Sequence, residues 1–505
     1  MKKTNNIRFV ALLLALMMLC CTAVACANNN NGDDTTPADT TVADPSGSDT
    51  TVSGGTTEPE LTPDLPEVSY QGEKITFLER TLEMGNNIDV YFNEFYADLS
   101  LAEPVSNAVY ERNMAIVDKY GIEIESVREL NNDLQKKFTN AADAGDKICD
   151  VISANGKTTM SLAVSGYLRD INTLDYIDYD NPWWMGMAMD TSSISGKNAF
   201  ILGDINIQMF TAVEAVYFNK QLVVDLGLDD IYTIVKEGDW TLDKMYEYCS
   251  AAVAELDGDN IMTDADRYGM IFNNHSWQPF FYGSGKLLVE KDAADTPKLM
   301  LTDDNVYDTL AKVIDFLADD EVMACSSWFS YGNMGNYFQA GHGMFYAQLM
   351  YVTLEMRQGE LDFGILPVPK VDASQDEYYS YVHQKSSYTS VPKVNQDLDK
   401  TGIILEDMAY ESYKLIRPAF FDVMLDGKVA KDVESTEMLD YLYENVYVCV
   451  LQAMSSVGLD ADTVMRTFIT NKTGSSTMSS TLKKNESLWR RTLGTVSDSF
   501  ADKVE

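Results

Sequence analysis

Short β-rich runs alternate with amphipathic helical stretches along most of this chain, and that alternation limits the fold more than any other feature. Lys74–Leu78 is a short run of strand-forming residues. Ser106–Tyr120 places apolar residues near helical spacing and stops at Gly121, and Ile122–Val127 then alternates apolar and polar side chains. The same rhythm predicts strands at 150–152, 268–272, 343–346 and 363–366 and helices at 132–144, 243–254 and 305–317. We therefore expect an α/β fold, with mostly parallel sheets flanked by helices.

The first 25 residues have the layout of a secretory signal peptide. Three basic residues precede the apolar run Phe9–Cys21, and small residues follow at 22–25. The apolar run is shorter than the roughly 20 residues that a membrane-spanning helix needs. The sequence Ala-Val-Ala-Cys at 23–26 resembles a bacterial lipobox, which implies that Cys26 is lipidated and becomes the first residue. The alternative is an ordinary secreted protein with a chance cysteine. We expect a lipid anchor at the extracellular face of the cell membrane.

Residues 26–67 are predicted to form a disordered tether. The tract is rich in Asn, Asp, Thr, Ser, Gly and Pro and has almost no large apolar residue. Such a composition cannot bury enough apolar area to offset the chain entropy that folding removes. A flexible chain of about 40 residues has an r.m.s. reach of roughly 35 Å, which separates the folded body from the membrane.

Charge and length restrict what the folded body does. Three basic and no acidic residues leave with residues 1–25, so the net charge changes from −40 to −43. A polyanion of this size does not bind nucleic acid by neutralising phosphates, because that requires clustered Lys and Arg. The body from about residue 68 onward is longer than one hydrophobic core usually supports, so two lobes are expected.

Cysteine and histidine usage makes structural zinc improbable. The four cysteines of the body are far apart and are expected to be small buried hydrophobic residues, although pairing stays open: Cys149, Cys249, Cys325 and Cys449. The three histidines form no pair at the spacing of zinc ligands.

Four stretches, in this order, resemble the extracellular solute-binding proteins of ABC sugar importers, the maltose-binding-protein class: Asp146–Asp170, Thr211–Lys220, Phe338–Lys370 and Tyr388–Lys393. The second includes Ala-Val-Glu214-Ala and is similar to the segment where that family's chain first crosses between lobes. The resemblance implies a two-lobed periplasmic-binding-protein type II fold joined by hinge strands. It places 68–212 plus 384–430 in lobe 1 and 213–383 plus 431–505 in lobe 2.

The resemblance also implies a function. It describes a membrane-anchored protein that captures a carbohydrate, an oligosaccharide in our reading, by hinge closure and delivers it to an ABC permease without a required cofactor. No Gly-x-Ser-x-Gly motif, P-loop or Gly-x-Gly-x-x-Gly helix start is present, so we expect no enzyme activity. Two alternatives stay open: a surface glycoside hydrolase, which needs only two carboxylates, and a surface adhesin lipoprotein.

Strand ends and the first crossing supply the candidate polar ligands. Ligands of open α/β sheets bind beyond the carboxyl ends of the strands, which selects the loop after 150–152. Asn155, Lys157 and Thr158 lie there, and the resemblance places a ligand loop at the same position. Glu214 resembles the carboxylate near the first crossing, with Thr211 competing for that position.

Aromatic residues supply candidate stacking plates for sugar rings. Trp183 and Trp184 are adjacent, so in an extended segment they point to opposite sides and one lies in the cleft. The alternative is that both pack between helices of lobe 1. Trp277 follows the strand at 268–272 and is the stronger candidate. Three further candidates follow a strand or lie near the return crossing: Tyr346, Gln348 and Tyr388.

The acidic loop at 255–266 resembles an EF-hand calcium loop. Oxygen-bearing residues recur at its first, third, fifth, ninth and twelfth positions: Glu255, Asp257, Asp259, Thr263 and Asp266. It departs from the pattern by Glu at the first position, Asn260 at the sixth in place of Gly, and Asp at the twelfth in place of Glu. Asn260 is able to adopt the left-handed turn. Two interpretations stay open here, a structural calcium ion and a solvated acidic loop.

Overall fold

The computed structural model describes residues 61–81, 92–101, 103–329, 334–356, 359–425, 433–448 and 453–505. The predicted signal peptide, Cys26 and tether residues 26–60 lie outside the described residues, as does Cys449. Residues Leu61–Glu505 form one compact unit. Within the predicted tether, Leu65 packs against the core, so ordered structure begins before residue 68.

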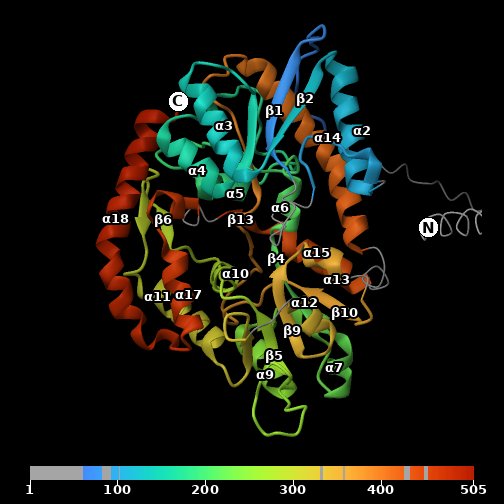
Figure 1. Ribbon diagram of the computed structural model, residues 1–505, viewed down its shortest axis with the longest axis vertical. Coiled ribbons are helices and arrows are strands. Elements are labelled where there is room, and N and C mark those ends of the chain that lie inside the picture. The colour runs from blue at the N-terminus through green and yellow to red at the C-terminus, as the bar shows by residue number, and fades with distance from the viewer. Residues whose placement is uncertain are drawn as a thin grey trace, which may run out of the picture. The chain divides into compact units, whose positions relative to one another are not determined.

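A four-stranded sheet forms the centre of lobe 1, in the order β12-β3-β1-β2. Its strands are β1 (Lys74–Arg80), β2 (Glu123–Glu129), β3 (Val151–Asn155) and β12 (Ser387–Ser390). Two of these strands, β1 and β2, are labelled in Figure 1. β1 is parallel to β2 and β3, as predicted, and β12 is antiparallel to β3. The helices of this lobe are α2 (Pro104–Tyr120), α3 (Asn131–Asp143), α4 (Gly156–Ser165), α5 (Gly186–Ser192), α6 (Ile207–Thr211) and α14 (Leu398–Leu425).

Local sequence explains the ends of α2. The Glu103 carboxylate accepts hydrogen bonds from the backbone N–H groups of Val105 and Ser106, at 3.1 and 2.8 Å. Pro104 occupies the first turn, where a missing N–H removes no helical hydrogen bond. Gly121 ends the helix at φ 58°, a left-handed conformation that glycine adopts without steric penalty. The predicted helix and its stop are confirmed.

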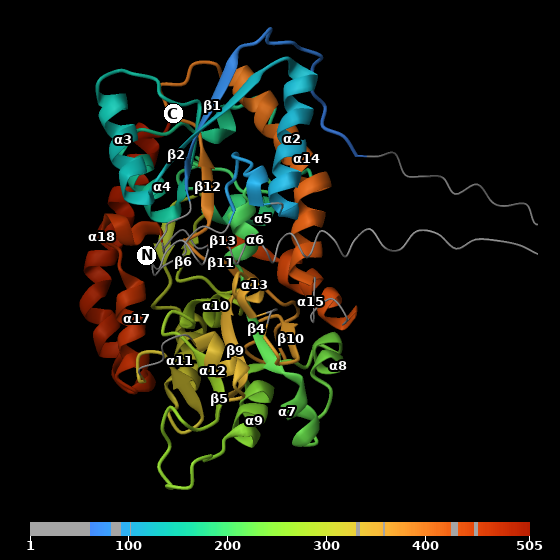
Figure 2. The same cartoon turned by 45° about the vertical axis from the view of Figure 1, so that its right-hand side comes forward.

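A five-stranded mixed sheet forms the centre of lobe 2, in the order β10-β4-β9-β5-β8 (Figure 2). Its strands are β4 (Glu214–Asn219), β5 (Tyr268–Phe272), β8 (Met323–Cys325), β9 (Gly343–Leu349) and β10 (Phe363–Leu366). β5 is parallel to β8 and β9, whereas β4 is antiparallel to β9 and β10. The helices are α7 (Lys220–Asp225), α8 (Ile231–Lys236), α9 (Leu242–Ala252), α10 (Trp277–Tyr282), α11 (Asp304–Ala318), α12 (Met334–Gln339) and α13 (Val352–Met356), beside the hairpin β6 (Val289–Lys291) and β7 (Pro297–Leu299).

Extended segments connect the two lobes. An antiparallel bridge joins Val213 to Val382, and the backbone N–H of His383 donates to the Ala212 carbonyl at 2.9 Å. The chain therefore passes from the first sheet to the second near 212–213 and returns near 382–383. β11 (Ser380–Val382) pairs in parallel with β13 (Val446–Val448), which adds a third segment to the hinge.

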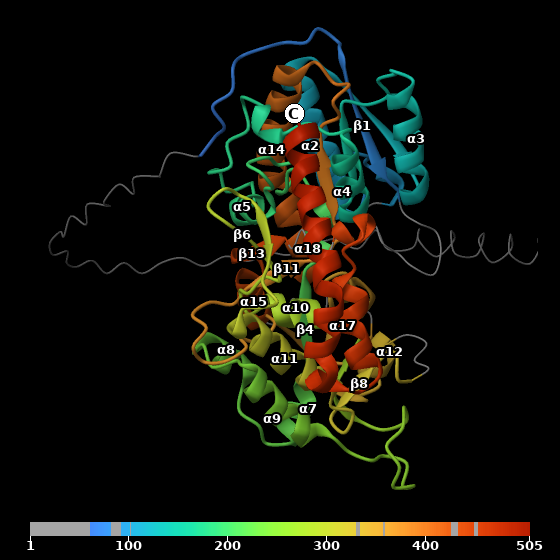
Figure 3. The same cartoon turned by 90° about the vertical axis from the view of Figure 1, so that its left-hand side faces the viewer.

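The C-terminal helices contact both lobes (Figure 3). They are α15 (Val433–Glu444), α17 (Ala461–Thr470) and α18 (Met478–Lys503). α15 packs on β10 and α17 on α11, both in lobe 2, whereas α18 contacts α4 of lobe 1 as well as β7. The sequence places all of 431–505 in lobe 2, and α18 also contacts lobe 1, so the lobe assignment of the last helix stays a prediction. Among the described residues, no helix has the length and apolar character to cross a membrane.

Candidate functional site

The loop after β3 is organised by a helix cap. The Asn155 side-chain oxygen accepts a hydrogen bond from the backbone N–H of Thr158 at 2.9 Å, which starts α4. Of the three predicted ligand residues in this loop, Lys157 is exposed, Asn155 is half-buried and Thr158 is buried. The Gly156 backbone N–H donates to the Gln384 carbonyl at 3.0 Å, so this loop lies beside the return crossing.

Tyr388 supports the first turn of α4. Its ring is buried and lies edge-on to Phe200, with the ring centroids 4.8 Å apart. A Cβ at Gly156 would lie 3.2 Å from this ring, so a glycine at that position allows the close approach. The Tyr388 ring is packed inside lobe 1 and offers no exposed face for stacking.

The adjacent tryptophans both pack inside lobe 1. Their indole N–H groups donate to the two carboxylate oxygens of Glu406 on α14, Trp183 at 2.9 Å and Trp184 at 2.7 Å. The side-chain amide of Asn181 donates to the same carboxylate at 3.0 Å. The buried Glu406 carboxylate accepts both indole N–H groups and so holds both side chains against α14. This agrees with the alternative that both tryptophans pack between helices of lobe 1. Contact of either indole with a ligand stays a prediction, and Trp184 also lines a cavity beside the hinge.

Glu214 is the first residue of β4, directly after the first crossing. Its side chain is 4% exposed, and one carboxylate oxygen, Oε1, accepts no hydrogen bond among the described residues. Burial raises the pKa of Glu214 to about 7, and the nearby Ser276 hydroxyl offsets the increase only in part. A buried carboxyl group with an unused oxygen is a strong acceptor for a hydroxyl donor.

The segment after β5 contacts the C-terminal part of the chain. The Trp277 indole N–H donates to an Asp462 carboxylate oxygen at 3.0 Å, and the Gln278 amide donates to the same oxygen at 2.7 Å. Trp277 is fully buried, so its ring is not an open stacking plate in this conformation. The Gln278 carbonyl oxygen has no hydrogen-bond partner among the described residues.

Two histidines join this group from different sides of the hinge. A His275 ring nitrogen lies 3.3 Å from the Asp462 carboxylate, which also pairs with Arg466 at 3.1 Å. The His275 and His383 rings are edge-to-face, with centroids 6.4 Å apart. Burial, with the nearby charges of Lys385, His275 and Lys157, lowers the pKa of His383 to about 3. His383 is therefore a neutral imidazole at pH 7. Its Nδ1 accepts a hydrogen bond from the Lys385 backbone N–H at 3.1 Å, so Nε2 carries the proton and is a donor.

These residues define the interlobe cluster: Glu214, His275, Ser276, Gln278, His383 and Asp462. Glu214 belongs to the first crossing and His383 to the return crossing, while Asp462 starts α17. The cluster combines carboxylate, amide, imidazole and hydroxyl groups, which suits a neutral ligand rich in hydroxyl groups. Sequence reasoning selected Glu214 and the neighbouring Trp277 but missed the other members. His275, Ser276 and Gln278 were within reach, because they share the strand-end segment of Trp277.

Tyr346 and Gln348 lie on β9, beside β4. The Gln348 amide donates to the Tyr346 hydroxyl at 3.5 Å, and its side-chain oxygen accepts from the Leu349 backbone N–H at 3.0 Å. Both side chains are buried. The charge of Glu214 contributes to a raised Tyr346 pKa, after burial itself, so this pair lies near the edge of the interlobe cluster.

Lobe 1 brings buried charges to the same region. Arg80 at the end of β1 donates to the Lys385 carbonyl at 2.7 Å and to the Ser387 hydroxyl at 2.9 Å. Glu94 accepts from the backbone N–H groups of Ile207 and Gln208, and burial raises its pKa to about 7. Both contacts fix the lobe 1 side of the hinge.

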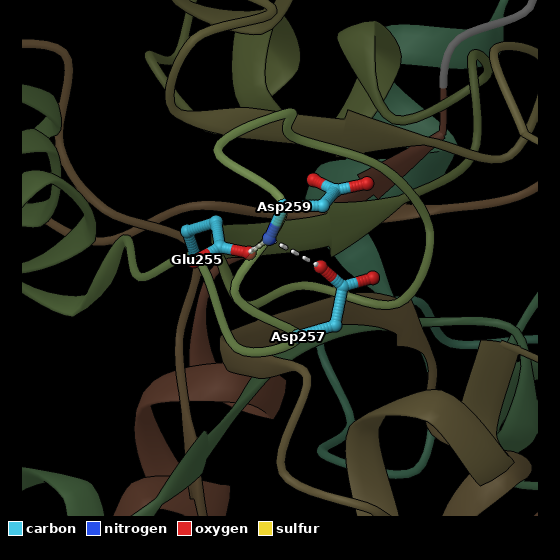
Figure 4. Close-up of side chains that lie close together, drawn as sticks. All are labelled: Glu255, Asp257 and Asp259. Carbon is cyan, nitrogen blue, oxygen red and sulfur yellow. Dashed lines mark hydrogen bonds between the residues drawn. The ribbon is translucent and has the colours of Figure 1, made fainter.

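The acidic loop of lobe 2 brings three of its five predicted metal ligands together (Figure 4). Carboxylate oxygens of Glu255, Asp257 and Asp259 lie within 4.8 Å of one another. Asn260 has φ 62°, the expected left-handed conformation. Asp266 is different, because its two oxygens accept from the backbone N–H groups of Leu256 and Thr263, each at 2.7 Å. Asp266 and Thr263 therefore close the loop and lie outside the acidic group, and calcium binding by the remaining three stays a prediction.

Comparisons with known proteins identify the fold. No family model matches the sequence, and no curated protein matches it. An ABC substrate-binding protein of Listeria monocytogenes, solved with cycloalternan, has TM-score 0.54 and 13% identity over 84% of this chain and 99% of its own. A cyclic α-maltosyl-1,6-maltose binding protein of Arthrobacter globiformis gives 0.52 and 14% over 84% and 99%, and the sugar-binding protein MalE of Xanthomonas citri gives 0.51 and 13% over 83% and 99%. The chain has the two-lobed type II fold of maltose-binding-protein-like solute-binding proteins.

Proposed function

We propose that this chain is the solute-binding component of an ABC importer and captures a carbohydrate between its two lobes. The interlobe cluster is the observation that carries the proposal. Both hinge crossings and the strand-end segment of lobe 2 place hydrogen-bonding side chains there, and lobe 1 adds the exposed Lys157 nearby. Solved proteins of the same fold bind sugars according to their descriptions. The cluster binds and orients a ligand and carries out no bond-making step.

Closure supplies the mechanism. A ligand that contacts both lobes makes its full set of contacts only when the lobes are closed, so it shifts the population to the closed form. Glu214 accepts a sugar hydroxyl through its unused oxygen, and neutral His383 supplies one donor through Nε2. Release to the permease requires that these contacts separate with the lobes.

The lipid anchor completes the proposal. A lipidated Cys26 followed by a flexible tether keeps the protein at the extracellular face of the membrane, near its permease. The support is the order of basic, apolar and small residues before Cys26. Cys26→Ala is expected to move the protein from the membrane fraction into the medium, and an unchanged distribution contradicts lipidation.

A thermal-shift screen tests the ligand class. The mature chain is heated with a panel of saccharides and with oligopeptides as a counter-set. A saccharide present at 100 times its dissociation constant is expected to stabilise the protein by about 2.7 kcal/mol. Glu214→Gln is expected to weaken that shift. Stabilisation by peptides alone contradicts the carbohydrate assignment, released sugar indicates a hydrolase, and an unresponsive protein supports the adhesin alternative.

A further inference from the structure

A cavity of about 880 Å³ lies beside the hinge and shares no residue with the interlobe cluster. We name it the hinge-flank cavity and define it by Trp184, Asp204, Phe210, Arg417, Phe421 and Tyr443. These residues come from the segments before α5 and before α6, and from α6, α14 and α15. Its volume falls in the range of small-molecule sites, about 300–1,000 Å³.

Aromatic side chains form much of the wall. Phe210 and Tyr443 are edge-on with centroids 5.8 Å apart, and Trp184 is held by Glu406. Close packing requires glycine at position 203, because a Cβ there would lie 2.5 Å from the Trp184 ring. Tyr413, also in the wall, is 37% exposed and borders the opening. Fixed aromatic faces of this kind suit the apolar face of a sugar ring.

Charges of both signs line the wall. Asp204 is buried, and Arg417 lies 3.4 Å from each of its carboxylate oxygens. The Arg417 guanidinium also covers the rings of Tyr413 and Phe421, at 5.7 and 5.6 Å from their centroids. A cationic ligand would meet that guanidinium and Lys414, and an anionic ligand would meet three carboxylates, those of Asp204, Asp422 and Glu444. A neutral ligand with hydroxyl groups and an apolar face avoids both conflicts.

The cavity touches the hinge on two sides. Phe210 lies in α6, which leads directly into β4, and its carbonyl accepts from the Tyr443 hydroxyl at 2.6 Å. Val446 also lines the cavity and pairs with Ser380 of β11, which leads into the return crossing. A molecule held there would contact segments that close with the lobes, and its binding would therefore be coupled to ligand capture.

We propose that the hinge-flank cavity is a second binding site, for a neutral mono- or disaccharide, distinct from the interlobe cluster. The site is independent of the proposed capture function, since its walls are formed by other residues. Its occupant positions the hinge and so alters the affinity of the first site. Reciprocally, the first ligand alters the affinity of the second by the same factor.

Calorimetric titration of the mature chain with the neutral saccharide panel tests this. Thr436→Trp fills the cavity from an exposed position of α15, and Tyr413→Ala removes a partly exposed plate. We expect the wild type to bind two saccharides per chain. Each cavity variant should lose at least tenfold in affinity at the second site, while Glu214→Gln should weaken the first. Asp440→Trp and Tyr110→Ala are matched controls at exposed positions outside the cavity and are expected to leave both sites unchanged.

The outcomes separate this site from the capture function. A second site that persists in both Thr436→Trp and Tyr413→Ala overturns the proposal, and so does a wild-type stoichiometry of one or none up to millimolar saccharide. Loss confined to Glu214→Gln supports capture at the hinge alone. Loss confined to the cavity variants supports the hinge-flank site and contradicts capture at the interlobe cluster.

Discussion

Glu214 is deeply buried, and its carboxyl group lacks a full set of hydrogen-bond partners. Its pKa therefore differs between the folded protein and the unfolded chain. Burial raises its pKa from 4.5 to about 7, so between these values the folded protein holds a proton that the unfolded chain has lost. Stability from this group is therefore complete below about pH 4.5 and falls as pH rises to about 7.

Glu214→Gln tests that pH dependence. The amide is neutral at every pH, so the variant should gain stability relative to the wild type by more than about 1 kcal/mol between pH 5 and pH 8. Urea unfolding at both pH values measures the difference. A constant difference between the two proteins would show that Glu214 ionises normally in the fold.

Glu406 is the residue on which the tryptophan pair depends. Its carboxylate accepts both indole N–H groups and the Asn181 amide. Glu406→Ala leaves buried donors without an acceptor and should lower the free energy of unfolding by about 3 kcal/mol. Glu406→Gln keeps one acceptor and should cost about half as much. Urea unfolding followed by tryptophan fluorescence gives both values, and equal losses would contradict the hydrogen-bond explanation.

At the scale of elements, the hairpin β6–β7 of lobe 2 acts as a clasp on lobe 1. The Asp295 carboxylate accepts from the Gly196 backbone N–H at 2.7 Å and from the Ser193 hydroxyl at 2.9 Å. Lys291 pairs with Asp295 at 2.6 Å and donates to the Asp190 carbonyl and the Ser193 hydroxyl. These contacts favour closed lobes even before a ligand adds its own.

Asp295→Gly removes the carboxylate of the clasp, while Lys291 keeps its hydrogen bonds to the Asp190 carbonyl and the Ser193 hydroxyl. The backbone is not strained, because Asp295 has φ 57°, which glycine adopts freely. The radius of gyration of the ligand-free protein is expected to increase, and ligand affinity to fall several-fold, since closing then requires more of the binding energy. Small-angle scattering and calorimetry measure these changes. Glu290→Ala, at an exposed position on the same hairpin, is the control. Identical behaviour of the two variants would contradict the claim that the Asp295 contacts favour closed lobes.

The acidic loop offers a test by metal removal. Glu255, Asp257 and Asp259 converge, and the side chain of Glu255 raises the pKa of Asp257. A bound calcium ion would relieve that repulsion, so chelator should lower the melting temperature of the wild type. Asp257→Asn should respond less to added calcium. A melting temperature that does not change with chelator would contradict calcium binding and support a solvated acidic loop.

Periodicity was sufficient to predict most elements but not most of the site. Apolar spacing located β1, α2 and β5 because burial in a sheet or against it determines those patterns. It did not show that Asn155 caps a helix or that Tyr388 packs beneath one, since both roles depend on neighbours in space. Asp462 meets Trp277 across a separation of 185 residues, and no local pattern records such a contact.

At the scale of the whole molecule, α18 connects the lobes in addition to the hinge. Lys197 of lobe 1 donates to the carbonyls of Ala501 and Val504, and Lys503 donates to the Val164 carbonyl at 3.1 Å. The segment before α18 is attached to lobe 2, where the Ser475 backbone N–H donates to Asp315 at 2.6 Å. The contacts of α18 with both lobes therefore couple the unfolding of one lobe to the unfolding of the other.

Three buried free thiols report on each lobe separately. Cys149 lies in lobe 1, and Cys249 and Cys325 lie in lobe 2, which confirms the expected burial for these three. In the wild type, all three should become reactive at the same urea concentration, as in a cooperative transition. With Lys197→Met and Lys503→Met combined, Cys149 should react at a lower concentration than the other two, because lobe 1 loses these side-chain hydrogen bonds to the end of the chain, which weakens its attachment to α18.

Mass spectrometry of the labelled peptides assigns each thiol, and Lys484→Met on the exposed face of α18 is the matched control. Coincident reactivity in the double variant would place the coupling in the hinge strands alone. Separate transitions already in the wild type would mean that the lobes fold independently. The expected result would mean that α18 opposes lobe opening. The free energy of lobe opening then depends on the hinge, the clasp and the last helix together.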